Sequence, residues 1–335
     1  MKLITVHKQE EGQRLVKLLG AYLKEAPNSF FYKMLRKKNI TLNGKKADGT
    51  EKLKCGDEIR LFLSDETYEK FAGKVQPKEK FPMAKLNIVY EDSNVIFINK
   101  PAGMLSQKSV PSDVSLNEYL LGYLEKSGQW KQEESKAFRP SVCNRLDRNT
   151  SGLVICGKSM AGLQQMAALL KDRSLHKYYL CLVKGVMTES QHLEGYLLKD
   201  ENSNQVKIFQ KETEGAAHII TEYEPLYTDG EATLLKVTLV TGKSHQIRAH
   251  LSSIGHPIIG DPKYGDRKVN AFFRETYGIK NQMLHAWKLT FPELAEPLDN
   301  LSEKSFEAEP VGLMKQYLMK AKGDLQEWVH GIPED

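Results

Sequence analysis

The chain has no long hydrophobic run, and none of its apolar stretches approaches the roughly 18 residues that a membrane-spanning helix needs. Its first residues, Met-Lys-Leu-Ile-Thr-Val-His-Lys, become polar too soon for a secretory signal peptide. Because 40% of the 335 residues are hydrophobic, the chain is long enough to bury one large core and a smaller second one. We therefore expect a soluble, cytoplasmic protein that makes no membrane contact.

Cysteine is scarce, and the chain contains no Cys-x-x-Cys pair. The four cysteines are Cys55, Cys143, Cys156 and Cys181. Three of them lie in or beside apolar runs, which is typical of buried free thiols. The closest histidine pairs, His245 with His250 and His250 with His256, do not have the spacing of a zinc site and have no cysteine or acidic cluster nearby. We expect neither a disulfide nor a bound metal.

Charge of one sign is not in large excess, since 48 Lys and Arg residues against 43 Asp and Glu residues give a net charge of +5. This mild surplus permits a nucleic-acid partner but does not identify one. The distribution of the basic residues is more informative. Six of them, Lys33, Arg36, Lys37, Lys38, Lys45 and Lys46, lie close together near the start of the chain.

Those basic residues belong to a compact pattern of helices and strands. Helical apolar spacing covers 12–23, and Asn28 or Ser29 can cap a second helix that ends near Lys37. A strand then enters an Asn-Gly turn, and a further strand is expected at 58–63. On the residues alone, the charges at the end of the second helix indicate either a solvated helix end or an RNA-binding surface.

Composition divides the chain into three parts. Residues 1–64 form the N-terminal domain, 65–85 are charged and Pro/Gly-containing and read as a linker, and 86–335 form the main domain. In the main domain we expect strands at 94–99, 178–183, 221–226, 232–240 and 287–291, and helices at 116–124, 160–170, 244–254 and 311–322. Because Pro292 follows it, the strand at 287–291 is expected at a sheet edge or as a final strand. This irregular order favours an α+β fold.

The most informative segment is 144–158, Asn-Arg-Leu-Asp-Arg-Asn-Thr-Ser-Gly-Leu-Val-Ile-Cys-Gly-Lys. It places the carboxylate of Asp147 between Arg145 and Arg148, in a loop that leads into a buried strand. The flanking arginines favour the ionised carboxylate, which suits a nucleophile or a base. On these residues alone, a salt-bridged loop acid without a chemical role is the more common arrangement.

The segment resembles the signature His-Arg-Leu-Asp-x-x-Thr-Ser-Gly of the RluA-type pseudouridine synthases. The match covers 145–147 and 150–152, and Asn144 stands where the family usually has His. The resemblance implies that Asp147 is the catalytic nucleophile. It also implies that Arg145 moves into the space left by a flipped-out base, and Arg145 is a candidate phosphate contact as well.

Lys177-Tyr178-Tyr179 opens an apolar strand, in which alternation places Lys177 and Tyr179 on one face. A core tyrosine is the ordinary explanation for either aromatic residue. The family has Lys-x-Tyr here, so the resemblance implies that Lys177 binds substrate and that Tyr179 stacks on the target base. Tyr179 is also a candidate for the proton-abstracting group. Leu284 resembles a family leucine that packs against the active-site tyrosine and base, although simple core packing fits the same residue.

The second strong motif is Thr-Gly-Lys-Ser-His-Gln-Ile-Arg at 241–248, which resembles the family's Thr-Gly-Arg-Thr-His-Gln-Ile-Arg. We expect His245 and Arg248 on one helix, three residues apart. A helix-borne arginine is commonly a surface or ion-pair residue. The resemblance implies instead that Arg248 pairs with Asp147 and keeps it charged in a partly buried cleft, and that His245 contacts substrate.

The N-terminal order of helix, helix, Asn-Gly turn and Gly-Asp-x-Ile resembles the small RNA-binding domain named after ribosomal protein S-four, also called the αL domain. In that domain the basic second helix and the following hairpin contact RNA. The resemblance therefore implies substrate binding by Lys33, Arg36, Lys37 and Lys38.

Together the resemblances imply an isomerase that converts specific uridines of an RNA into pseudouridine, on a mixed, mainly antiparallel sheet. No cofactor is required, because uridine and pseudouridine are isomers. Large-subunit ribosomal RNA is the expected substrate and transfer RNA the alternative, and we expect a monomer. Whether the aspartate attacks C6, attacks C1′ or removes a C2′ proton is left open. An RNA-binding protein without catalysis and an aspartate-dependent nucleoside hydrolase are the other classes considered.

Overall fold

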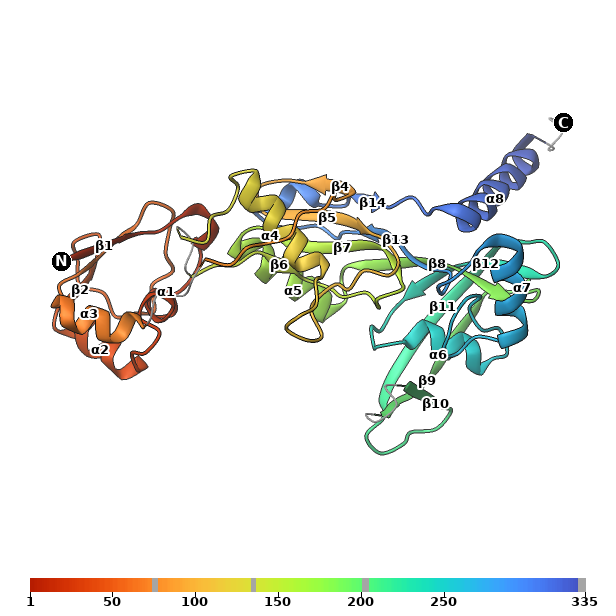
Figure 1. Ribbon diagram of the computed structural model, residues 1–335, viewed down its shortest axis with the longest axis horizontal. Coiled ribbons are helices and arrows are strands. Elements are labelled where there is room, and N and C mark those ends of the chain that lie inside the picture. The colour runs from red at the N-terminus through yellow and green to blue at the C-terminus, as the bar shows by residue number, and fades with distance from the viewer. Residues whose placement is uncertain (74–77, 134–136, 201–204, 331–335) are drawn as a thin grey trace.

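The computed structural model describes residues 1–73, 78–133, 137–200 and 205–330. A small N-terminal unit and a larger unit built on one long sheet lie end to end in an elongated molecule (Figure 1). The expected α+β class is confirmed, because helices and a mainly antiparallel sheet make up the larger unit.

The N-terminal unit is a three-stranded antiparallel sheet, in the order β1-β3-β2, covered by two helices. Its elements are β1 (Lys2–Thr5), the 3-10 helix η1 (Lys8–Glu10), α1 (Leu15–Tyr22), α2 (Asn28–Arg36), β2 (Ile40–Leu42) and β3 (Glu58–Leu61). Helical spacing puts Leu15, Leu18 and Leu19 on one buried face of α1, which packs into the same core as Phe31 of α2.

The predicted cap of α2 is wrong. Asn28 is already the first helical residue, and Pro27, whose ring holds an extended backbone geometry, takes the N-cap position without a side-chain hydrogen bond.

The prediction of a linker at 65–85 is wrong for its first part, which forms helix α3 (Asp65–Ala72). Ser64 caps this helix by accepting a hydrogen bond from the Thr67 amide, and two acidic residues in the first turn complement the helix dipole. Tyr68 and Phe71 pack against the N-terminal core, so this highly charged segment forms an amphipathic helix.

The main sheet has eleven strands, and its principal order is β10-β9-β11-β12-β8-β13-β7-β5-β4. Among the described strands, only β13 and β7 pair in parallel. The strands are β4 (Ile88–Glu91), β5 (Val95–Lys100), β6 (Ser141–Val142), β7 (Ser151–Gly157), β8 (His176–Lys184), β9 (Gln191–Asp200), β10 (Gln205–Phe209), β11 (Ala217–Thr228), β12 (Ala232–Leu239), β13 (Leu284–Thr290) and β14 (Ser305–Glu307).

Strand β13 is not at an edge, as Pro292 had suggested, but lies between β8 and β7 in the middle of the sheet. The proline falls two residues beyond the end of the strand at Thr290 and therefore removes no hydrogen bond from the ladder. The central position matters because β13 joins the two halves of the sheet.

Six further helical segments surround the main sheet. They are α4 (Leu116–Lys126), α5 (Met160–Asp172), α6 (Gln246–Ser253), α7 (Arg267–Tyr277), the 3-10 helix η2 (Asp299–Leu301) and α8 (Gly312–His330). A capping box of Ser115 and Glu118 opens α4, and Ser159 caps α5, so both helices begin at the residues expected from the sequence. In α8, Tyr317 packs against the sheet and donates a hydrogen bond to Asp229. None of the described helices is long and apolar enough to cross a membrane.

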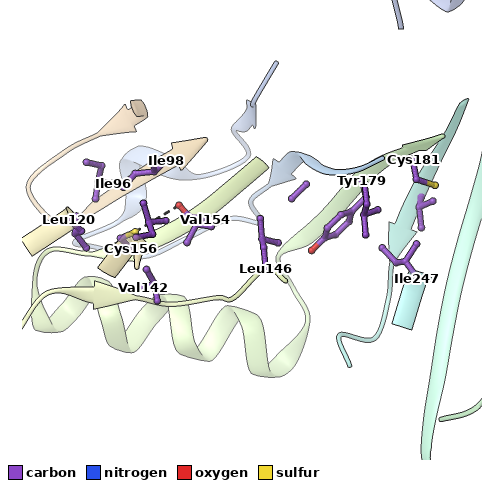
Figure 2. Packing of buried hydrophobic residues seen from close by; sticks show 14 of the residues in the cluster. Ile96, Ile98, Leu120, Val142, Leu146, Val154, Cys156, Tyr179, Cys181 and Ile247 are labelled. Atoms are coloured by element: carbon purple, nitrogen blue, oxygen red, sulfur yellow. Dashed lines mark hydrogen bonds between the residues drawn. The ribbon is translucent and has the colours of Figure 1, made fainter. Parts of the chain in front are cut away.

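One continuous hydrophobic cluster runs from β5 and β7 to β8 and α6 (Figure 2). It includes Ile98, Val154, Leu146, Tyr179 and Ile247. Leu146 lies immediately before Asp147, so burial of this leucine anchors the polar loop on the core.

The close approach of β7 to β13 requires glycine at position 152. Gly152 has a φ of +112°, and a Cβ atom there would overlap the backbone of Ala286. We expect Gly152→Ala to lower the free energy of unfolding by about 3 kcal/mol or more, because backbone strain and overlap act together. Gly128→Ala is the matched control, since Gly128 also has positive φ but has open space around it, and should cost about 1 kcal/mol. Chemical denaturation measures both, and equal losses would show that β13 yields to the added methyl group.

Candidate active site

Asp147 lies in the short loop between β6 and β7, and 27% of its side chain is exposed. The loop is held at both ends by local hydrogen bonds. The Thr150 amide donates to the Asp147 carbonyl at 3.0 Å. Asn144 accepts from the Ile155 amide at 2.8 Å and donates to the Leu153 carbonyl. Asn144, which stands where the family signature has His, therefore fixes the loop to β7. Its contacts indicate a structural role.

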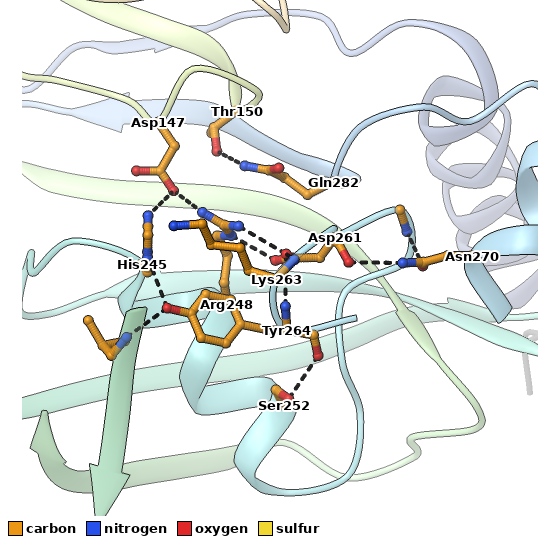
Figure 3. A network of polar contacts seen from close by, with 12 residues as sticks. Asp147, Thr150, His245, Arg248, Ser252, Asp261, Lys263, Tyr264, Asn270 and Gln282 are labelled. Atoms are coloured by element: carbon orange, nitrogen blue, oxygen red, sulfur yellow. Dashed lines mark hydrogen bonds and ion pairs between the residues drawn. The ribbon is translucent and has the colours of Figure 1, made fainter. Parts of the chain in front are cut away.

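Arg248 joins Asp147 to a second carboxylate (Figure 3). Its Nη1 donates to Asp147 Oδ2 at 2.7 Å, while its Nε and Nη2 donate to the two oxygens of Asp261 at 2.7 and 2.9 Å. The Asp261 side chain is fully buried and also accepts from the amides of Lys263 and Tyr264. These contacts hold the pKa of Asp261 below its usual range although burial opposes the shift. The two hydrogen bonds to Asp261 fix the plane of the Arg248 guanidinium, and its Nη1 is left to donate to Asp147.

His245 does not lie within the helix, which corrects the expectation of a helical His245-Arg248 pair. It is the N-cap of α6 and adopts a left-handed backbone with a φ of 57°. Its Nδ1 lies 2.9 Å from the Tyr264 hydroxyl, and its Nε2 lies 3.9 Å from Asp147 Oδ2. The left-handed residue turns the ring back over the carboxylate, which a residue inside the helix would not do.

The environment of His245 favours a neutral ring. Burial lowers the pKa of His245 below its usual range, although the Asp147 carboxylate opposes this shift. The Tyr264 hydroxyl accepts from the Val206 amide at 2.9 Å, which leaves its own O–H to donate to Nδ1 of His245. This arrangement favours the tautomer with hydrogen on Nε2, the nitrogen that faces Asp147.

Tyr179 lies in the core cluster with Leu146 and Ile247, and its ring is almost completely buried (Figure 2). Burial, and then the Asp147 carboxylate, raise the pKa of Tyr179 above its usual range. A phenol with a raised pKa is a poor proton acceptor because little phenolate is present near neutral pH. The environment therefore favours a role in packing or stacking over proton abstraction.

Lys100 holds the Asp147 loop to the end of β5. Its side chain is fully buried, and its Nζ donates to the carbonyls of Pro101, Met104 and Arg148 at 2.8 to 3.1 Å. Burial lowers the pKa of Lys100 to about 8, and the nearby Asp147 opposes the shift. Lys100 thus ties the end of β5 to the residue that follows Asp147.

The remaining sequence-predicted residues lie at different distances from this centre. Leu284 is buried and pairs in register with Cys181, two positions from Tyr179 on β8. Lys177, half-buried at the start of β8, approaches Gly242 in the segment before α6. Arg145 is exposed on the Asp147 loop. The basic group of Lys33, Arg36, Lys37 and Lys38 is exposed at the end of α2, at the opposite end of the molecule from α6 (Figure 1).

Sequence reasoning missed Asp261, Tyr264 and Lys100. The signal for the first two was Gly-Asp-Pro-Lys-Tyr-Gly at 260–265, whose glycines and proline are typical of a turn. Lys100 opens Lys-Pro-Ala-Gly, which has the composition of a turn as well. In the part of the chain that the structure describes, no group of three or more His, Cys, Asp or Glu side chains is arranged to hold a metal ion.

The sequence of this chain is similar to those of a known protein family. Residues 94–253 match the family model described as RNA pseudouridylate synthase. The ribosomal large subunit pseudouridine synthase C of Vibrio parahaemolyticus is 30% identical over 94% of this chain and 97% of its own length. The chain belongs to the RNA pseudouridine synthase family. The enzyme is also similar to the synthase C proteins of Vibrio cholerae, at 31% identity over 87% of this chain and 89% of the relative, and of Escherichia coli, at 29% over 87% and 88%.

A solved structure shows the same fold. Human RNA Pseudouridylate Synthase Domain Containing 4 superposes with a TM-score of 0.55 at 20% identity, over 70% of this chain and 92% of that one. The family identifies the enzyme as an isomerase, so the two other classes considered, a binding protein without catalysis and a nucleoside hydrolase, are not supported.

The ion pair of Arg248 with Asp147 leads to a prediction about turnover. We expect Arg248→Ala to lower the kcat of this enzyme roughly 100- to 1,000-fold, and Arg248→Lys to recover only part of that loss, because an ammonium does not form the planar fork. Pseudouridine formation by the purified variants tests this, and an Ala variant with parental turnover would contradict the pairing.

Proposed function

We propose that this pseudouridine synthase isomerises uridines in large-subunit ribosomal RNA, with Asp147 as its nucleophile. The observation that carries the assignment of the nucleophile is the 2.7 Å contact of Arg248 Nη1 with Asp147 Oδ2. The choice of RNA is supported by the relatives, whose names all refer to the ribosomal large subunit.

The two oxygens of Asp147 have different roles in this proposal. Both the Arg248 bond and the His245 approach involve Oδ2, whereas Oδ1 makes no hydrogen bond with any described residue. Oδ2 is held, and Oδ1 is the oxygen that reacts. With 27% of the side chain exposed, that oxygen is accessible to a nucleotide that has left its stack.

The reaction breaks the bond from C1′ to N1 of uridine, forms a bond from C1′ to C5, releases the C5 proton to solvent, and adds a proton from solvent to N1. A carboxylate assists by adding to C6, by adding to C1′, or by removing a C2′ proton. Tyr179 supplies a buried aromatic ring beside the carboxylate, which supports stacking on the uracil as its role. Another base, including water, then accepts the C5 proton.

The proposed contacts with the rest of the RNA use cations outside the Asp147 pair. Arg145, exposed on the Asp147 loop next to the buried Leu146, is proposed to fill the space of the flipped nucleotide. Lys177 is proposed as a phosphate contact. The N-terminal unit, with α1, α2 and the three-stranded sheet, is proposed as an S-four-type RNA-binding domain, and the protein as a cytoplasmic monomer.

The nucleophile is tested by Asp147→Asn, which keeps the shape of the side chain and removes its charge. We expect pseudouridine formation to fall to background while thermal stability and RNA affinity change little, because one oxygen still accepts from Arg248. Asp299→Asn is a matched control, since it makes the same change at an exposed aspartate of η2, outside the site. Substantial turnover by the purified Asp147 variant would end the assignment.

The substrate is tested by mapping pseudouridines across total RNA from cells that carry the Asp147→Asn variant and from the parent. The proposal predicts that the pseudouridines missing from the variant lie in large-subunit ribosomal RNA. Missing pseudouridines in transfer RNA, with ribosomal RNA fully modified, would favour the alternative substrate.

The basic end of α2 is tested by neutral substitutions at four positions. We expect Lys33→Gln, Arg36→Gln, Lys37→Gln and Lys38→Gln together to weaken RNA binding. The salt dependence of binding should also flatten, by about one unit of slope for each phosphate that the variant no longer neutralises. A control with the same charge change removes exposed lysines of the main unit, at Lys171, Lys211, Lys280 and Lys304. An unchanged salt slope in the first variant would exclude α2 as the binding surface.

A further inference from the structure

A pocket of about 460 Å³ opens beside the Asp147 loop, and neither Asp147 nor Arg248 is among the residues that line it. Its walls come from three segments that are distant in sequence. The first is the loop after β5, the second is α4, and the third is the Asp147 loop itself, through Arg148. The volume lies in the range of small-ligand sites and is sufficient for one nucleobase with its sugar.

The loop after β5 spans 101–115 and is unusually long for a connection within a domain. Its first part is fastened to the Asp147 loop. Ser106 exchanges hydrogen bonds with both backbone groups of Leu146 at 3.0 Å, and the Gly103 amide donates to the Arg148 carbonyl at 2.9 Å. The second part, 107–114, extends into solvent with Val110 and Val114 about half exposed. A loop whose first part is held by hydrogen bonds and whose second part is exposed forms a stable wall for a ligand that enters from solvent.

The pocket contains hydrogen-bond donors and an acceptor that have no partner among the described residues. Arg148 is exposed and uses only its Nε, which donates to the Gly103 carbonyl at 3.1 Å, so in the described part of the chain Nη1 and Nη2 are unpaired. Asp113 uses Oδ2 to accept from the amides of Ser109 and Val110, and its Oδ1 makes no bond to a described residue. The ring of Tyr119, half-buried on α4, adds an aromatic surface.

This combination fits an unpaired nucleotide. Aromatic rings and guanidinium planes stack on bases, a guanidinium fork binds phosphate, and a carboxylate accepts from the amino and imino groups of a base edge. Arg148 directly follows Asp147, and consecutive Cα atoms lie about 3.8 Å apart, so a strand that delivers uridine to Asp147 comes near Arg148.

We propose that this pocket binds the base of a nucleotide flanking the target uridine, unstacked from its neighbours, with Arg148 on the adjoining phosphate and Tyr119 against the base. The pocket is thus a second point of RNA recognition that contributes to the choice of uridine. The inference rests on the proposal that Asp147 is the nucleophile, and it does not depend on which class of RNA is modified.

The test pairs changes in the RNA with changes in the protein. The substrate is the segment around a uridine found by pseudouridine mapping, made intact and with a single abasic residue at each of the two positions on either side. Loss of the C5 hydrogen reports kcat and KM for the full-length enzyme. We expect one flanking abasic site to raise KM about tenfold, and Arg148→Gln and Tyr119→Leu each to raise KM on intact RNA by a similar factor. On the abasic RNA the two variants should add little further loss.

Lys108→Gln is the control, because Lys108 lies on the same loop, carries the same charge and does not line the pocket. Its effect should be the same on intact and abasic RNA. The proposal is overturned if no flanking abasic site changes KM, if its effect multiplies fully with those of Arg148→Gln and Tyr119→Leu, or if both variants lower kcat alone. Failure of the nucleophile assignment appears separately, as turnover by Asp147→Asn. Tyr119→Leu also keeps the test valid if Arg148→Gln disturbs the loop, which thermal unfolding reports.

Discussion

The site depends on one guanidinium shared between two carboxylates. Arg248 is almost completely buried and Asp261 is fully buried, and each charge offsets the desolvation cost of the other. The pair would be neutral by itself, but Asp147 adds a second negative charge at the solvent-facing edge. The group therefore keeps a net charge of −1 while the Asp147 carboxylate is oriented. Because Arg248 already pairs with Asp261, it holds the proposed nucleophile in place without neutralising it completely.

Much of the larger unit serves to bring these three residues together. Asp147 comes from a loop before β7, Arg248 from the first turn of α6, and Asp261 from the loop that follows α6. Strand β13 lies between β7 and β8 and so aligns the loop that carries Asp147 with the strand that carries Tyr179. Lys100 adds a buried cation beneath the loop, held by three carbonyls. The sheet thus supplies rigid supports for residues that lie on loops and at helix ends.

The sequence predicted the pair of Asp147 and Arg248 better than the residues that support this pair. Asp147 and Arg248 were found because two motifs matched a family, and the 2.7 Å contact agrees with the expected pair. Asp261 was missed because its role depends on Arg248, a partner that only the tertiary fold places beside it.

The same limit applies to secondary structure. The starts of α4 and α5 and the buried strands were predicted well because their signals are local. Helix α3 was missed because its apolar face is narrow and packs on a core elsewhere in the chain, and the central position of β13 was missed because strand order is not a local property. His245 was expected inside α6, and its left-handed geometry at the N-cap has no signal in an ordinary helical pattern.

The most direct test of the shared guanidinium is a double-mutant cycle on kcat with Arg248→Ala, Asp261→Asn and the double variant, each checked for folding. If Asp261 acts only by holding Arg248, each single change should slow turnover, and the double variant should be no slower than Arg248→Ala alone. Removing the Asp261 charge should also restore some of the stability that Arg248→Ala loses, because it removes an unpaired buried carboxylate. Losses in kcat that multiply in the double variant, with no recovery of stability, would contradict the account.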